Sequence, residues 1–240
     1  MPSPIIDIQD LSYTYPDGTP GLAGISLQIF PRDFVILAGH NGSGKSTLLR
    51  HFNALIPSSR VRINGTPSST NIPAVRQRVG MVFQDADTQI VAETVFDDVA
   101  FGLENLKIPA DEIRERVHMQ LEAIGLSSLQ NRHPSTLSGG EKRKLALAGI
   151  LVMNPEILVF DEPFSNLDYP STRMLMELIQ DLHHKGHTLI IAAHDLTRLM
   201  GMANRMIIME KGSISKDAPI EDLADQLEAF GINAPFHKTG

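Results

Sequence analysis

Short, continuous runs of apolar residues recur along this chain and predict the strands of a buried sheet. Runs of this kind, without alternation, are typical of parallel strands that are covered on both faces. They occupy residues 34–38, 79–83, 157–160, 188–192 and 205–209. A turn at residues 210–212 follows the last run.

Apolar and polar residues alternate near the N-terminus, at residues 5–15 and 25–29. This period of two predicts half-exposed strands, and the Pro16-Asp17-Gly18 turn separates them. A further strand at 60–63 turns at Asn64-Gly65. We therefore expect a small antiparallel sheet laid against the parallel one.

Helical spacing of apolar residues dominates the middle of the chain. Between residues 85 and 155 it appears at 95–106, 111–124 and 141–153, without a convincing strand, and other helices are expected at 45–55, 170–185 and 220–230. We expect one domain over residues 1–240. Within it we expect an α/β core at 1–84 and 155–215, a helical subdomain at 85–154, and a C-terminal helix and tail at 216–240.

Composition narrows the function classes. The 240 residues include no cysteine, which excludes disulfides, thiolate metal sites and cysteine nucleophiles. The net charge of −7 argues against broad, sequence-independent binding of nucleic acid. No leader segment and no apolar run of bilayer-spanning length is apparent, so we expect a soluble chain.

A glycine-rich turn lies between the apolar run at 34–38 and a predicted helix that opens at Lys45. The G-x-x-x-x-G-K-S spacing is complete, and such a loop aims backbone N–H groups and a helix N-terminus at one point. Lys45 would reach the β- and γ-phosphates of a nucleoside triphosphate, and the Ser46 hydroxyl would bind Mg²⁺. The loop comprises Gly39, His40, Asn41, Gly42, Ser43, Gly44, Lys45, Ser46 and Thr47.

Two acidic residues, Asp161 and Glu162, directly follow the apolar run at 157–160. Ligands of open parallel sheets bind at the carboxyl ends of the strands. We expect Asp161 to hold Mg²⁺ through water and Glu162 to polarise the water that attacks the γ-phosphate. Taken alone, the pair would equally suit an ordinary helix cap.

A second predicted helix start follows the sequence Leu137-Ser138-Gly139-Gly140-Glu141. A serine and two glycine amides at a helix N-terminus form an anion site, although a simple cap has the same composition. We expect the basic run at 142–144 to be a solvated face.

Together, the LSGGE sequence, the glycine loop and the Asp-Glu pair resemble the ATP-binding subunits of ABC transporters, over nearly the whole chain. The resemblance implies an α/β, RecA-like P-loop NTPase fold with an antiparallel β-subdomain and an inserted α-helical subdomain. It also implies that Tyr15 stacks on adenine, with Tyr13 as the alternative ring. Gln84 would contact Mg²⁺ and a membrane partner, His194 would lie near the γ-phosphate, and Asp168 would belong to the D-loop.

By the same resemblance, two subunits close head to tail on ATP. The residues of one chain that meet ATP on the partner's loop would be Ser138, Gly139, Gly140 and Glu141. Magnesium would be held by Ser46, Gln84 and Asp161. Glu141 and Lys144 replace the glutamine and arginine frequent in this motif, and we expect little effect because backbone groups and serine make the phosphate contacts.

A narrower resemblance, to the ATPases of energy-coupling factor (ECF) importers, covers residues 84–106, with Ala86 and Thr88 as departures. It implies a second ATPase subunit, a transmembrane coupling protein and a substrate-capture protein at the cytoplasmic face of the membrane. The substrate would be cobalt, nickel or a vitamin. Another ABC transporter class, a non-transport ABC ATPase acting on DNA or ribosomes, and an adenylate-kinase-like enzyme are the alternatives.

Three histidines, His183, His184 and His187, share a short segment and suggest a metal site. Gly186 interrupts the helix between them. We therefore interpret them as a solvated helix end.

Overall fold

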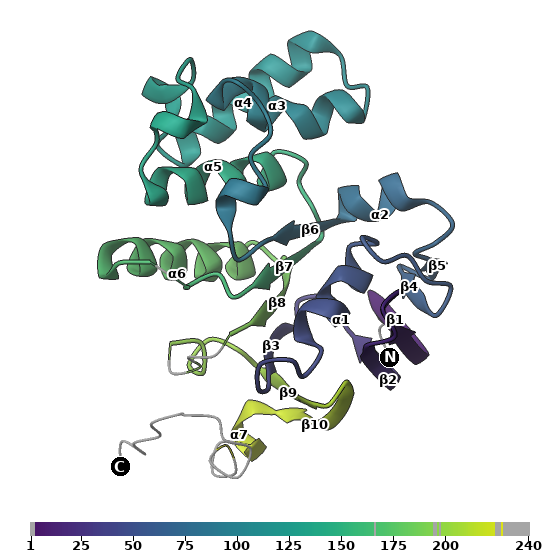
Figure 1. Ribbon diagram of the computed structural model, residues 1–240. Coiled ribbons are helices and arrows are strands. Elements are labelled where there is room, and N and C mark those ends of the chain that lie inside the picture. The colour runs from purple at the N-terminus through teal and green to yellow at the C-terminus, as the bar shows by residue number, and fades with distance from the viewer. Residues whose placement is uncertain (1–2, 166, 194–195, 197, 224–226, 228–240) are drawn as a thin grey trace.

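The computed structural model describes residues 3–165, 167–193, 196, 198–223 and 227. Six strands form one sheet in the order β10-β9-β3-β8-β7-β6 (Figure 1). The five strands from β9 to β6 run parallel, and β10 pairs antiparallel with β9. Their bounds are β3 Phe34–Ala38, β6 Val79–Val82, β7 Ile157–Asp161, β8 Thr188–Ala192, β9 Arg205–Glu210 and β10 Ser213–Pro219.

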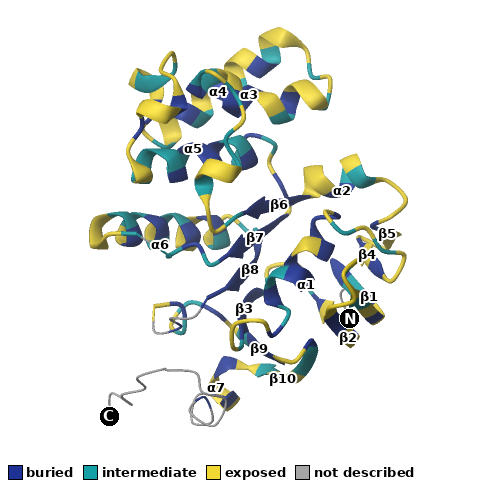
Figure 2. Cartoon of the chain, viewed as in Figure 1, coloured by how far each residue is buried: buried dark blue, intermediate teal, exposed yellow. Residues whose placement is uncertain are grey.

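Helices cover both faces of this sheet, which explains why its central strands are apolar throughout. Helix α1, Lys45–Phe52, packs Leu48 and Leu49 into one core together with Val35 of β3. Helix α6, Tyr169–His184, packs Leu175 and Ile179 into a second core on the other face. Figure 2 shows the resulting buried strands between helices that are exposed on their outer sides. The prediction of strands buried on both faces is confirmed.

An antiparallel sheet lies against the same core, in the order β2-β1-β4-β5. Its strands are β1 Ile6–Thr14, β2 Pro20–Ile29, β4 Val61–Ile63 and β5 Thr66–Pro67. Along β1, Ile6, Ile8 and Leu11 are buried, and the alternation that the sequence pattern predicts is interrupted where the register shifts between Ile8 and Leu11. Helix α2, Ile72–Arg78, connects this sheet to β6; neither α2 nor β5 is predicted from the sequence.

Helices form the segment between β6 and β7, and the structure, which describes all of residues 85–154, places no strand there. Its three long helices, visible at the top of Figure 1, share a third core. Their bounds are α3 Val95–Asn105, α4 Ala110–Ala123 and α5 Gly139–Leu151, with short 3₁₀ turns η1 Ala86–Thr88, η2 Ser127–Leu129 and η3 Pro134–Thr136. Helix α5 also places Leu147 and Ile150 in the core under α6, so it joins the helical segment to the large sheet.

The C-terminal part differs from the prediction of helix and tail from residue 216, because strand β10 continues to Pro219. Most of its residues are exposed or half-exposed and polar, so hydrophobic periodicity gives no signal; pairing with β9 makes it a strand. Helix α7 covers Ile220–Leu223, and the rest of the predicted helix lies largely outside the described residues. Among the described helices, none combines the length and apolarity needed to cross a bilayer.

Candidate functional site

The glycine loop is shaped by tight backbone packing at the end of β3. Gly39 has φ +141°, and a Cβ at this position would lie 2.3 Å from the Met209 carbonyl oxygen of β9. Gly44 has φ +101° and precedes α1 without any side-chain cap. The first amides of α1 are therefore free of a side-chain acceptor, as an anion site at a helix start requires.

Lys45 lies at the centre of the loop. Its side chain is 5% exposed, and its Nζ donates hydrogen bonds to the carbonyl oxygens of Gly39 at 2.7 Å and of His40 at 3.1 Å. Burial lowers the pKa of Lys45, while the nearby charges of Glu162 and Asp161 raise it. The ammonium group is thus held inside the loop, where polyphosphate would offer it stronger acceptors than carbonyl oxygens.

Ser46 and Asp161 meet across the end of the sheet, where the Ser46 hydroxyl donates to Asp161 Oδ1 at 3.0 Å. Burial raises the pKa of Asp161 above its ordinary value, and the hydrogen bond from Ser46 opposes this shift. A hydroxyl and a carboxylate oxygen are ligands that Mg²⁺ prefers, with water and phosphate oxygens completing its shell. No cluster of three or more acidic, histidine or cysteine side chains suited to a metal occurs among the described residues.

Gln84 and Glu162 are brought together by the register of two parallel strands. Val82 of β6 pairs with Phe160 of β7, and both polar residues stand two positions beyond that pair. Gln84 Nε2 donates to Glu162 Oε2 at 3.4 Å. The two adjacent carboxylates therefore have different hydrogen-bond partners: Asp161 bonds to Ser46 of the glycine loop, and Glu162 bonds to Gln84.

Glu162 has an unusual backbone conformation, with φ +48°. Non-glycine residues seldom adopt the left-handed region, so surrounding contacts must hold it. Its amide donates to the Ala192 carbonyl of β8 at 2.9 Å, and Ser165 Oγ donates to its Oε2 at 3.3 Å. His194, predicted to lie near the γ-phosphate, falls outside the described residues.

Tyr15, the predicted adenine-stacking residue, is tied to α1, since its hydroxyl lies 2.6 Å from Thr47 Oγ1. Tyr13 contacts it edge to face, with ring centroids 5.0 Å apart. Both rings pack over Gly21, where a Cβ would lie 3.1 Å from each. The structure thus places both candidate rings beside the start of α1, and the prediction of Tyr15 over Tyr13 stays open.

His51 supports this aromatic pair from inside α1. His51 is 1% exposed, and its Nδ1 lies 2.8 Å from the Thr47 carbonyl oxygen. Its ring packs edge to face against Tyr13, with the ring centroids 5.2 Å apart. Burial lowers the pKa of His51, although the bond to Thr47 raises it. The folded chain therefore keeps this imidazole neutral.

A pH dependence of stability follows from His51. The unfolded chain accepts a proton on His51 near the ordinary pKa of about 6.5, whereas the folded chain resists it. The free energy of unfolding therefore contains a favourable contribution from neutral His51. This contribution is fully present above the ordinary pKa of histidine, and it is lost as the pH falls below that pKa. Thermal unfolding between pH 7.5 and 5.5 should show a steeper decline for the native chain and for a control His184→Asn than for His51→Asn. Equal slopes in all three would contradict this role of His51.

The second predicted anion site caps helix α5. Ser138 Oγ accepts from the Glu141 amide at 3.3 Å and donates to Glu141 Oε2 at 2.8 Å, and the Ser138 amide donates to the same oxygen at 2.7 Å. Ser138 and Gly139 are exposed. Within the described residues no hydrogen bond or ion pair joins this helix start to the glycine loop.

Asp168 caps α6, accepting a hydrogen bond from the Ser171 amide at 2.9 Å. Hydrogen bonds from Ser171 lower the pKa of Asp168. The predicted D-loop aspartate thus has a structural contact in this chain, as the cap of helix α6.

The basic run at 142–144 is not the solvated face that the sequence suggested. Lys142 forms an ion pair with Asp87 at 2.6 Å, and Arg143 is buried, with 6% exposure. The helical period could have shown this, because Arg143 precedes Leu147 by four residues and Ile150 by seven. The histidine segment is only partly the solvated helix end that the sequence suggested: His184 is exposed, whereas half-buried His183 and His187 lie within hydrogen-bond distance of the Arg32 and Pro155 carbonyl oxygens.

Comparison with known proteins agrees with this geometry. The family model described as "ABC transporter" matches residues 22–165. The chain is 41% identical over 227 residues to an energy-coupling factor transporter ATP-binding protein of Methanothermobacter thermautotrophicus, covering 92% of this chain and 73% of that protein.

Two solved structures share the fold. The chain superimposes with a TM-score of 0.81 and 35% identity on cbiO1 of Clostridium perfringens, described as part of the ABC transporter complex cbiONQ, covering 95% of this chain and 93% of that one. A dimeric ATP-binding cassette in a post-hydrolysis state with ADP and Pi gives a TM-score of 0.78 and 26% identity, with 90% and 98% coverage. The predicted P-loop NTPase fold is confirmed, and the chain belongs to the ABC transporter ATPases, among which it is similar to the energy-coupling factor ATP-binding proteins.

Proposed function

We propose that this chain is the ATP-hydrolysing subunit of an ECF-type importer that takes up a small substrate, either a transition metal ion such as cobalt or nickel or a vitamin. The observation that carries the proposal is the likeness, over nine-tenths of the chain, to an energy-coupling factor ATP-binding protein. The likeness to a subunit of the cbiONQ complex supports it.

The site suggests a role for each residue in hydrolysis. The loop amides and Lys45 bind the phosphates of ATP, and Tyr15 stacks on adenine. Ser46 and Asp161 would hold Mg²⁺ with help from Gln84, and the ion would neutralise charge on the β- and γ-phosphates. Glu162 accepts the proton of the attacking water, and His194 acts near the γ-phosphate.

A second ATPase subunit would complete each site. The start of α5, where Ser138 and Gly139 are exposed, offers backbone amides to an anion. Head-to-tail pairing would place this start over ATP held by the partner, with Asp168 near the junction. The dimeric assembly of a structural relative supports this arrangement.

We also propose that the chain divides into a nucleotide-binding core at 1–84 and 155–215 and a helical subdomain at 85–154.

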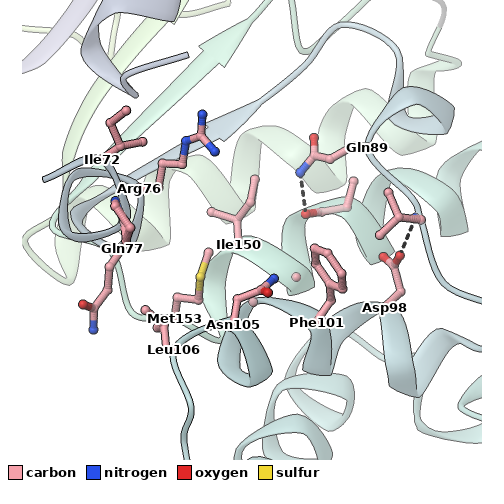
Figure 3. Close-up of a pocket in the computed structure, with 15 residues that line it drawn as sticks. Ile72, Arg76, Gln77, Gln89, Asp98, Phe101, Asn105, Leu106, Ile150 and Met153 are labelled. Atoms are coloured by element: carbon pink, nitrogen blue, oxygen red, sulfur yellow. Dashed lines mark hydrogen bonds between the residues drawn. The ribbon is translucent and has the colours of Figure 1, made fainter. Parts of the chain in front are cut away.

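A groove between helix α2 and helices α3 and α5 of the helical segment is the proposed docking surface for the transmembrane coupling protein (Figure 3). Its volume is about 640 Å³, and it exposes two apolar side chains, Val91 at 63% and Phe101 at 49%. Exposed apolar residues beside a groove are typical of a surface that receives an apolar partner segment. The lining residues are Ile72, Pro73, Arg76, Gln77, Gln89, Val91, Asp98, Phe101, Gly102, Asn105, Leu106, Ala146, Gly149, Ile150 and Met153.

Gln89 connects the groove to the site, and Asp98 holds the loop beside it. Gln89 accepts a hydrogen bond from the Phe83 amide, next to Gln84, at 3.3 Å and donates to the Ala146 carbonyl of α5 at 3.2 Å. Asp98 Oδ1 accepts from the amide of Val91 at 2.8 Å (Figure 3). A partner that presses on this groove would therefore act on both Gln84 and α5, at the cytoplasmic face of the membrane.

Copurification from membranes tests the proposal. A tagged chain solubilised in mild detergent should carry a polytopic coupling protein and a small capture protein, identified by mass spectrometry. Phe101→Asp should reduce their recovery at least about tenfold, because it places a charge in an apolar contact, while ATPase activity of the free chain changes less than about twofold. Met119→Asp, at an exposed apolar residue of α4 outside the groove, is the control.

The identity of the copurified proteins decides between the alternatives. Two ordinary permeases would assign the chain to another ABC transporter class. Ribosomes or DNA would overturn the transport role. Equal recovery with Phe101→Asp and the native chain would overturn the docking surface alone.

A further inference from the structure

Arg143 is a buried cation at the junction of three segments. It projects from helix α5, and its Nη2 donates to the Ser165 carbonyl oxygen at 3.3 Å, beyond the end of β7. It also lines a cavity of about 330 Å³ together with Gln84 and Asp85, which follow β6. The neighbouring Lys142–Asp87 ion pair joins α5 to the same segment after β6.

Among the described residues, the Arg143 guanidinium finds only part of the hydrogen-bond acceptors that it could use. Its Nη1 is buried and has no hydrogen-bond partner within the part of the chain that the structure describes. Burial lowers the pKa of Arg143, and the charge of Asp85 across the cavity opposes this shift. A buried guanidinium with an incomplete set of acceptors is unfavourable for stability. A packing role alone would be served better by an apolar side chain.

Ser165, the residue that Arg143 contacts, is directly connected to Glu162. The Ser165 amide donates to the Glu162 carbonyl oxygen at 3.2 Å, and its hydroxyl donates to Glu162 Oε2 at 3.3 Å. Glu162 needs such support because its backbone lies in the left-handed region. The Arg143 side chain thus anchors the turn from Glu162 to Ser165 to helix α5.

We propose that Arg143 is a positioning residue for ATP hydrolysis: by fixing the Ser165 carbonyl to helix α5, it sets the place of the Glu162 carboxylate. The inference rests on the proposed role of Glu162 as the base. It also gives helix α5, which carries the Ser138 anion site at its start, a direct connection to the carboxylate that would activate water.

The test compares Arg143→Met with the control Arg173→Met, which removes an exposed arginine of α6. Arg143→Met should lower kcat for ATP about tenfold and leave KM within about twofold, because substrate binding does not involve Arg143. Its melting temperature should not fall, since a partly satisfied buried charge is removed. Arg143→Lys, which keeps one donor for the Ser165 carbonyl, should recover most of the lost activity.

A native kcat in Arg143→Met would overturn the proposal. So would a parallel loss of kcat, ATP affinity and melting temperature, because that pattern indicates a purely structural role.

A double variant identifies the route of the effect. If Arg143 acts through the Ser165 turn, Arg143→Met combined with Ser165→Ala should lose no more kcat than the worse single variant. Loss equal to the product of the two single effects would contradict this route. Glu162→Gln, measured in parallel, separates the two claims. Full turnover in Glu162→Gln would contradict the assignment of Glu162 as the base. An inactive Glu162→Gln together with a fully active Arg143→Met would contradict only the positioning role of Arg143.

Discussion

Glu162→Gln is expected to bind ATP as tightly as the native chain and to hydrolyse it about 100- to 10,000-fold more slowly, the range typical for loss of a general base. Glutamine keeps the size and one acceptor oxygen of glutamate but cannot take a proton. Glu162 stands beside Asp161 at the end of β7 and contacts Gln84, so the change leaves the Ser46–Asp161 pair intact. Phosphate release measures turnover, and titration with a fluorescent ATP analogue measures binding.

Glu177→Gln is the matched control, because Glu177 is an exposed partner of Arg173 on α6. Native turnover in Glu162→Gln would exclude Glu162 as the base. The same variant tests pairing: with ATP bound and hydrolysis blocked, it should elute as a dimer in size-exclusion chromatography. A monomer that transfers phosphate to a second nucleotide would instead favour a kinase-like enzyme.

Lys45→Met should lower ATP affinity about 10- to 100-fold and abolish measurable hydrolysis. The loss of affinity corresponds to one charge-assisted hydrogen bond lost in a buried site. Lys45 is the buried cation of the glycine loop, and its ammonium now bonds to the Gly39 and His40 carbonyl oxygens. Methionine keeps a similar side-chain length without the charge. Isothermal titration with ATP and an assay of phosphate release measure the two effects.

Lys216→Met, at an exposed residue of β10, is the control for loss of a lysine. Retention of native affinity by Lys45→Met would show that ATP binds without this ammonium and would exclude the predicted role of Lys45 in phosphate binding. Lys45→Arg should also fail, because the planar guanidinium presents its donors in a wider fork than an ammonium does.

The sequence determined the parts of this protein whose cause lies within a few consecutive residues. Residues 34–38 and 157–160 are apolar without a break, which predicts strands covered on both faces, and both strands are buried. The Gly39–Ser46 spacing specifies its own loop, because positive φ and close packing need glycine where Gly39 and Gly44 stand. Ser138 and Glu141 likewise predict a helix start, and they form a capping box.

The sequence prediction was wrong where the local pattern was weak or favoured exposure to solvent. Strand β10 is mostly exposed and polar, so nothing in its own residues distinguishes it from a loop; its neighbour β9 supplies the hydrogen bonds that make it a strand. Arg143 lies in a run of three basic residues, which favours solvent, yet the packing of α5 against the large sheet buries it.

Only the tertiary structure decided which distant residues meet. The pairing of β6 with β7 places Gln84 beside Glu162, and the packing of α5 against the large sheet places Arg143 beside Ser165. The packing of α2, α3 and α5 forms the groove around Phe101. Strand order and register depend on the packing of the whole core, which no short segment encodes. Periodicity and glycine turns predict elements, whereas the relative placement of those elements, and with it the site, follows from how they bury one another.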